Sequence, residues 1–214
     1  MLDLSATRIN AFTFGVLTGL TGIEHGFFEL LQGSVVPDGL VIEAIGPEHR
    51  FWDLGTEIAL TIVPNFQVTG LLAITLGLAM IVWSIAFVQT RYGAHVLALL
   101  SAMLFLCGGG FAPLGSAIVA IIAAARINRP MIWWRAHIPG RMRGLLAGSW
   151  KGALLVVVVT YLFCIMGAIS GWPLLLYFDA MTVNKLLMVI GLAVLVVMFY
   201  LIPAGFAFDM RSRV

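Results

Sequence analysis

The chain has 214 residues, of which 61% are hydrophobic and only 10% are charged. Soluble domains are typically about one-quarter charged, so this composition excludes a water-soluble single domain. The net charge of +2 says little, but the charges are segregated along the chain. Acidic residues are concentrated between 24 and 57, whereas residues 126–151 contain six bases and no acid.

Four apolar segments are long enough to be transmembrane helices, since a helix needs roughly 20 apolar residues to cross a bilayer. They are residues 10–31, about 60–88, 151–170 and 186–208. The start of the chain, MLDLSATRIN, lacks the basic region and the cleavage site of a signal peptide. We therefore expect the first segment to be a retained anchor.

The segment 94–126 is too long for one straight span and short for two. Its centre, CGGGFAPLG at 107–115, contains three consecutive glycines, Gly108 to Gly110, and Pro113, which interrupt a helix. Two interpretations remain, a tight helical hairpin or one broken helix with an interfacial tail. Lys and Arg are enriched in cytoplasmic loops, and the hairpin gives the better charge bias.

The predicted fold is therefore an all-α polytopic membrane bundle, one transmembrane domain over residues 1–214. We expect about six crossings with 94–126 as a short hairpin, or five if that segment crosses once. Both termini would be cytoplasmic, in a cell membrane. Residues 32–56 would form an acidic outer loop, and residues 126–150 a basic cytoplasmic loop at the membrane interface.

The basic loop contains an aromatic pair, Trp133 and Trp134, followed by Arg135. Tryptophan rings favour the headgroup level, and arginines favour the anionic inner leaflet. We expect these three residues to contact membrane lipids. A nucleic-acid or partner-binding role for the loop is the weaker alternative.

The first segment, 10–31, carries two stripes at helical spacing. One stripe is polar and consists of Thr18, Thr21, His25, Glu29 and Gln32. The other consists of Gly15, Gly19, Gly22 and Gly26. Small residues at this spacing let a second helix approach closely, so we expect this helix to lie at the centre of the bundle. His25 and Glu29 are four residues apart and can meet on one face.

A second polar stripe lies in GTEIALTIVPNFQVTG, residues 55–70. If this stretch is helical, its polar residues recur every four positions: Glu57, Thr61, Asn65 and Thr69. In the six-crossing topology both stripes lie in the outer half of the bilayer and reach the same depth. The predicted binding site therefore consists of Glu24, His25, Glu29, Glu57 and Asn65.

Several polar groups at one depth in a membrane are costly, which favours a functional role for them. His25, Glu29 and Glu57 have the chemistry to bind a divalent metal such as zinc, iron or manganese. The same groups suit a proton or cation pathway, or acid–base catalysis on a lipid-soluble substrate. The structural alternative is that the carboxylates lie near the outer interface and His25 bonds a neighbouring helix. The sequence contains no nucleotide-binding loop and no haem-ligating histidine pair, so neither cofactor is expected.

Three stretches, GIEHGFFELLQG, FWDLGTEIALTIVPNFQVTG and GGGFAPLGSAIVAIIAAARI, resemble segments of an uncharacterised family of small bacterial multi-pass membrane proteins. The resemblance covers roughly residues 12–127. It implies a bacterial or archaeal membrane protein, and it implies no activity and no catalytic residues.

The leading hypothesis is a membrane protein that binds or translocates a cation, proton or small polar ligand from the outer side. One alternative is a membrane enzyme that acts on a lipid-soluble substrate with the same residues. Another is an accessory structural subunit of a larger membrane complex. Membrane lipids are the expected partners, a homo-oligomer or larger complex is left open, and nucleic acid is not expected.

Overall fold

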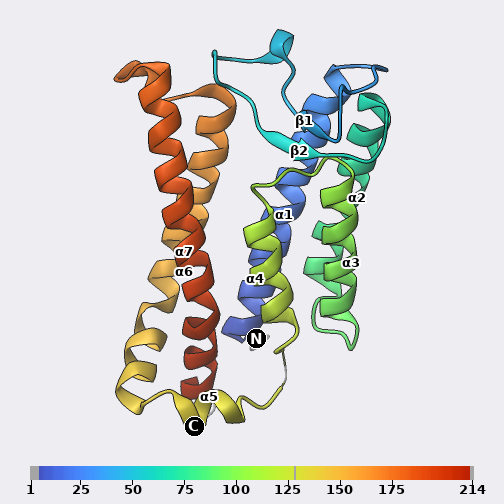
Figure 1. Ribbon diagram of the computed structural model, residues 1–214. Helices are drawn as coiled ribbons and strands as arrows, with labels where there is room; N and C mark the ends of the chain where they lie inside the picture. The colour runs from blue at the N-terminus through green and yellow to red at the C-terminus, as the bar shows by residue number, and fades with distance from the viewer. Residues whose placement is uncertain (1–4, 128, 213–214) are drawn as a thin grey trace.

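The fold comes from a computed structural model that describes residues 5–127 and 129–212. These residues form long, roughly parallel and antiparallel helices with a small two-stranded sheet at one end (Figure 1). The helices are α1 (Ala6–Leu31), α2 (Phe66–Ala86), α3 (Gly93–Leu106), α4 (Leu114–Ala124), α5 (Ile132–His137), α6 (Gly140–Ser170) and α7 (Ala180–Ser212). The strands are β1 (Val41–Glu43) and β2 (Ile58–Leu60), and single 3-10 turns occupy Pro47–His49 and Leu174–Leu176.

Within the described residues, three helices are long and apolar enough to cross a membrane, namely α2, α6 and α7. They support the expected helical membrane bundle. The expected count of six crossings is not supported. Helices α3 and α4 have only 14 and 11 residues, and α1, although 26 residues long, is not among the three apolar helices. A straight span needs roughly 20 residues. The chain nevertheless breaks at 107–113 as predicted, so 94–126 forms two packed helices joined by the glycine turn.

Two predicted boundaries were wrong. The second apolar segment does not continue as a helix back to residue 60, because residues 58–60 form β2 and Asn65 caps α2. The predicted helical stripe through Glu57 and Thr61 therefore does not exist. The predicted basic loop, 126–150, contains α5 and the first turns of α6, which starts at Gly140.

The glycine stripe of α1 brings α2 into close contact, as the spacing predicted. A Cβ atom on Gly19 would lie 2.6 Å from the carbonyl oxygen of Gly77, and a Cβ on Gly77 would lie 2.6 Å from that of Gly19. Gly26 and Gly70 make the same reciprocal contact further along the helices. Both pairs leave no room for side chains, so the two backbones pack directly against each other.

The polar stripe of α1 is buried, and its members contact different neighbours. Thr18 lies 2.8 Å from Ser116 on α4, and Thr21 lies 2.9 Å from the hydroxyl of Tyr161 on α6. At the end of the helix, Gln32 donates to the carbonyls of Glu43 and Ala44. Helix α1 therefore lies at the centre of the bundle, as expected.

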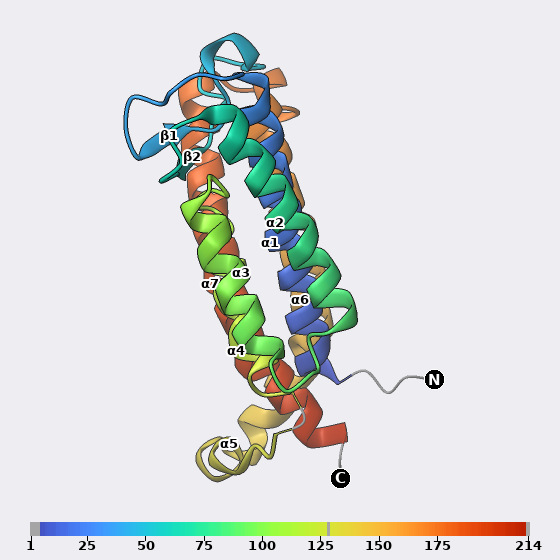
Figure 2. The ribbon, with the colours of Figure 1, turned by 90° about the vertical axis from the view of Figure 1, so that its right-hand side faces the viewer.

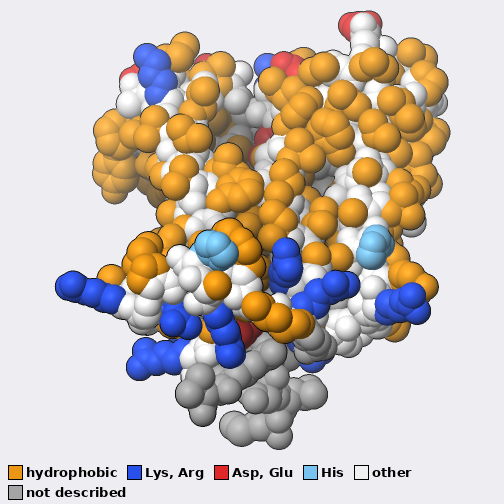
Figure 3. All heavy atoms as spheres, turned by 60° about the horizontal axis from the view of Figure 1, so that its bottom comes forward, with side chains coloured by type: hydrophobic (Ala, Val, Ile, Leu, Met, Phe, Trp, Pro, Cys, Tyr) orange, Lys and Arg blue, Asp and Glu red, His pale blue; other side chains and the backbone are white. Residues whose placement is uncertain are grey.

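The opposite end of the bundle is basic. Helix α5 lies there, where α1 begins and α7 ends (Figures 1 and 2). Lys and Arg side chains gather on this face (Figure 3). The buried Asp209 of α7 accepts hydrogen bonds from the backbone N–H groups of Ala6 and Thr7, at 2.6 and 3.0 Å. A carboxylate at a helix N-terminus is favourable, so this contact ties α1 to α7.

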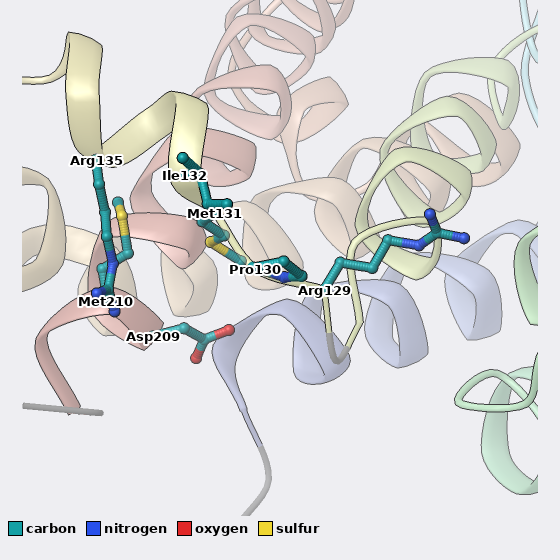
Figure 4. A pocket seen from close by; sticks show the side chains of 7 residues that line it. All are labelled: Arg129, Pro130, Met131, Ile132, Arg135, Asp209 and Met210. Carbon is teal, nitrogen blue, oxygen red and sulfur yellow. The ribbon is translucent and has the colours of Figure 1, made fainter.

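Figure 4 shows Asp209 reaching toward the start of α1 beside a cavity of about 230 Å³. Arg129 and Arg135 lie on the same cavity wall. The Asp209 carboxylate that lines this cavity already accepts hydrogen bonds from α1. Among residues 5–127 and 129–212, the cavity at the basic end of the bundle therefore has no acidic group left to bind a cation.

Candidate functional site

His25 is fully buried and lies between two carboxylates. Its Nδ1 atom is 3.0 Å from Oε2 of Glu24, and its Nε2 atom is 3.0 Å from Oε2 of Glu57. Nδ1 also lies 3.0 Å from the backbone carbonyl of Thr21. Because a carbonyl only accepts hydrogen bonds, Nδ1 carries the proton in this contact. In the neutral imidazole the lone pair of Nε2 then faces Glu57.

The contact between His25 and Glu57 is close but not aligned as a hydrogen bond, since both Nε2 and Oε2 have no hydrogen-bond partner. Both oxygens of Glu24 are buried and equally without a donor. Such groups are expensive to bury unless something compensates them. A bound proton or cation between these atoms would provide the compensation.

Glu29 adds a third carboxylate to the same region. Its side chain is fully buried, and neither of its oxygens has a hydrogen-bond partner. Among the described residues, no lysine or arginine pairs with Glu24, Glu29 or Glu57. Arg50, the single arginine of the loop 32–56, pairs with Glu43 instead. The region therefore contains more carboxyl groups than basic groups.

Glu57 reaches α1 because it lies directly before β2. Strand β2 pairs antiparallel with β1, with Ile58 opposite Glu43. The N–H of Ala44 donates to the carbonyl of Glu57 at 2.8 Å. This strand pairing fixes the backbone of residue 57 over the end of α1. Glu57 therefore has a defined position although it lies outside any helix.

The glycine turn between α3 and α4 closes the site from the other side. The N–H of Gly108 donates to the carbonyl of Leu60 at 2.9 Å, which attaches the turn to β2. Gly108 and Gly110 have positive φ angles, +90° and +85°. A Cβ atom on Gly108 would overlap the carboxylate of Glu29, and one on Gly110 would overlap the imidazole of His25. The turn is therefore part of the wall of the site.

The structure brings together most, but not all, of the predicted site residues. Glu24, His25 and Glu57 each offer a ligand atom, and these three atoms lie within 4.8 Å of one another. Glu29 lies beside them but outside this group. Asn65 does not join the cluster, because its side chain caps α2 through the N–H of Val68 and donates to Ser34.

The three ligand atoms lie further apart than the ligands of a bound metal ion. In tetrahedral zinc, two ligand atoms at about 2.1 Å from the ion are about 3.4 Å from each other. A spread of up to 4.8 Å therefore needs a closing movement of about 1.4 Å. We call Glu24, His25 and Glu57 the cation cluster. It differs from the predicted metal set of His25, Glu29 and Glu57 in that Glu24 replaces Glu29.

A large cavity adjoins the cation cluster. Its volume is about 880 Å³, and both Glu57 and Tyr161 line it. The sequence offered no signal for Tyr161, because its partner Thr21 lies 140 residues away. The glycine turn had a signal, three consecutive glycines in an apolar segment, which favours close backbone contact with another group.

At the basic end, the three residues predicted at the lipid interface differ in their surroundings. Trp133 is exposed and stacks on His137 with ring centroids 4.4 Å apart. Trp134 packs edge-on against Phe206 of α7 at 5.2 Å. Arg135 is exposed. Trp133 and Arg135 are thus free to contact lipid, whereas Trp134 anchors α5 to the bundle.

The chain matches no protein-family profile, no curated protein and no solved structure. The resemblance to a family of small bacterial membrane proteins therefore stays a prediction.

Proposed function

We propose that the protein binds a divalent cation within the membrane, at the cation cluster of Glu24, His25 and Glu57. One observation carries the proposal. Glu24, His25 and Glu57 each offer one ligand atom within 4.8 Å of the others. Both oxygens of Glu24, Oε2 of Glu57 and Nε2 of His25 have no hydrogen-bond partner. A divalent ion would accept the lone pairs of all three groups and offset their charge.

Each residue has a distinct role in this proposal. His25 binds through Nε2, while its Nδ1–H donates to the Thr21 carbonyl and holds the ring in place. Glu57 lies on the Nε2 side of the ring and supplies a charged oxygen, whereas Glu24 lies beside Nδ1 and has to turn toward the ion to supply another. Glu29, buried beside the cluster, is a further carboxyl group that the ion could contact. An imidazole with carboxylates suits zinc, iron and manganese better than calcium or magnesium.

The proposed orientation places the cation cluster in the outer half of the membrane. The cluster lies at the β1–β2 end, whereas the basic residues gather at the other end (Figure 3). Basic residues favour the cytoplasm, so both termini would be cytoplasmic in a cell membrane. The chain then passes through the bundle six times, with α3 and α4 as short spans that the bilayer accommodates by local thinning. Ions would reach the site from outside.

A metal titration tests the proposal. The purified protein, freed of metal with a chelator, is titrated with Zn²⁺ and with Mn²⁺ in detergent micelles. We expect one ion per chain, and binding at least ten-fold weaker in His25→Ala and Glu57→Gln. Asn65→Ala is the control, because Asn65 lies outside the cation cluster. Unchanged affinity in both cluster variants, or no bound ion in the wild type, would contradict the proposal.

A further inference from the structure

The cavity beside the cation cluster lies between the α6–α7 pair and α4, under the outer loop. Figure 1 shows α6 and α7 as a pair beside α1 and α4. The cavity wall at the outer end includes Trp52, whose indole N–H donates to the carbonyl of Ala168 at 3.0 Å. Its volume of about 880 Å³ is in the range of small-molecule sites.

The cavity is long as well as large. Asn184 and Met198 of α7 both line it, and they lie roughly 21 Å apart along a helix that rises 1.5 Å per residue. Gly191 lies between them, and a Cβ atom there would meet nothing within 4 Å. The groove therefore has room for an extended chain along α7, and its walls there are apolar.

The polar side chains of the cavity include one acid. Glu57 contributes this carboxylate, and Thr56, Asn184 and Tyr161 contribute uncharged polar groups. In the described part of the chain, no lysine, arginine or histidine lines this cavity. In the metal-free protein, a phosphate or carboxylate head group would face Glu57 without a cation to offset it, which is unfavourable. A group that donates hydrogen bonds would meet an acceptor.

We infer that the cavity binds a long-chain, membrane-soluble molecule whose head group donates hydrogen bonds, a hydroxyl or an ammonium. The head group contacts Glu57, and the apolar chain extends along α7 past Gly191 toward Met198. This ligand site goes beyond the cation site. The two share Glu57, but the apolar chain touches neither Glu24 nor His25, so each can exist without the other.

Four probes of equal chain length test the head-group chemistry. Hexadecanol, hexadecylamine, hexadecanoic acid at pH 8 and hexadecane are titrated into the chelator-treated, metal-free protein in detergent micelles, and bound probe is counted by native mass spectrometry. We expect the alcohol or the amine to bind at least ten-fold more tightly than the acid and the hydrocarbon. The better of the two identifies the head group. Equal binding of the acid, or displacement of the alcohol by phosphatidylcholine at equal mole fraction, would overturn the inference.

Two glycine variants test the location. Gly191→Phe fills the groove and should weaken binding of the alcohol or amine at least ten-fold. Gly152→Phe is the matched control, because Gly152 is also a helical glycine with no atom within 4 Å and it does not line the cavity. Undiminished binding in Gly191→Phe would overturn the inference. The inference would also be overturned if Gly191→Phe changed the oligomeric mass and left probe binding unchanged, because the groove would then be a contact between two chains.

Parallel metal titrations separate this inference from the proposed function. Gly191→Phe should keep its metal affinity, and His25→Ala should keep its affinity for the alcohol or amine. Loss of metal binding with retained probe binding would refute only the cation site. Retained metal binding with no probe binding in the wild type would refute only the ligand site.

Discussion

Replacement of Gly110 by alanine tests whether the glycine turn forms the wall of the site. The new methyl group would overlap the imidazole of His25, and the backbone there has a φ angle of +85°. Gly33 is a matched control, because its φ angle is +77° and a Cβ atom there would meet nothing within 4 Å. Both variants carry the cost of a left-handed backbone, and only Gly110→Ala carries the steric cost.

The magnitudes follow from these two contributions. A left-handed alanine costs about 1–2 kcal/mol, which is the whole effect expected for Gly33→Ala. Overpacking of a rigid site adds about 1–3 kcal/mol, so Gly110→Ala should lose about 2–5 kcal/mol. For a chain of this size each kcal/mol shifts Tm by about 2–4 °C, so the two variants should differ by about 2–12 °C.

Thermal unfolding in one detergent measures both variants, and metal titration of the folded forms completes the test. We expect Gly110→Ala to bind Zn²⁺ more weakly, because His25 must move, and Gly33→Ala to bind it normally. Equal Tm values for the two variants would show that the turn does not press on His25, and the account of the site wall would be wrong.

Three further predictions concern stability. Gly26→Leu should lower the free energy of unfolding, measured with denaturant, by at least about 1–3 kcal/mol because the new side chain separates α1 from α2. Gly152→Ala, in the open part of α6, should raise it by about 0.5–1 kcal/mol. Equal effects of the two variants would refute the close packing. Asn65→Ala should lose about 1 kcal/mol through loss of the α2 cap, and an unchanged Tm would refute the cap. Hydrogen bonds from Thr182 lower the pKa of Asp179 in the folded protein. The ionised Asp179 therefore stabilises the folded state fully above about pH 4, and this contribution is lost as the pH falls through the lowered pKa of the folded state. Asp179→Asn should remove this part of the acid-unfolding curve, and an unaltered curve would refute it.

The sequence was sufficient for α1 because its signals are local. A spacing of three or four residues predicts which side chains share a helix face, and both stripes of α1 are buried as expected, apart from the half-buried Gln32 just after the helix. The run of glycines likewise predicted the break between α3 and α4. These features depend on neighbouring residues only, so no knowledge of the tertiary fold was needed.

Glu57 was placed beside His25 for the wrong reason. Residues 57–61 were expected to be helical, but they pair with β1 and with the glycine turn, through contacts such as Gly108 to Leu60. Short apolar runs suit a helix or a strand equally well, and distant partners decide between them. Asn65 was misplaced with them, although an asparagine just before an apolar run is also a local sign of a helix cap.

X-ray absorption at the zinc edge of the zinc-loaded protein tests the cation cluster most directly. The cluster contains a single imidazole, so the account predicts one nitrogen ligand at about 2.0–2.1 Å with oxygen ligands around it. This nitrogen signal should disappear in His25→Ala. Two or more imidazoles, a sulfur ligand, or an unchanged spectrum in that variant would show that the metal binds elsewhere.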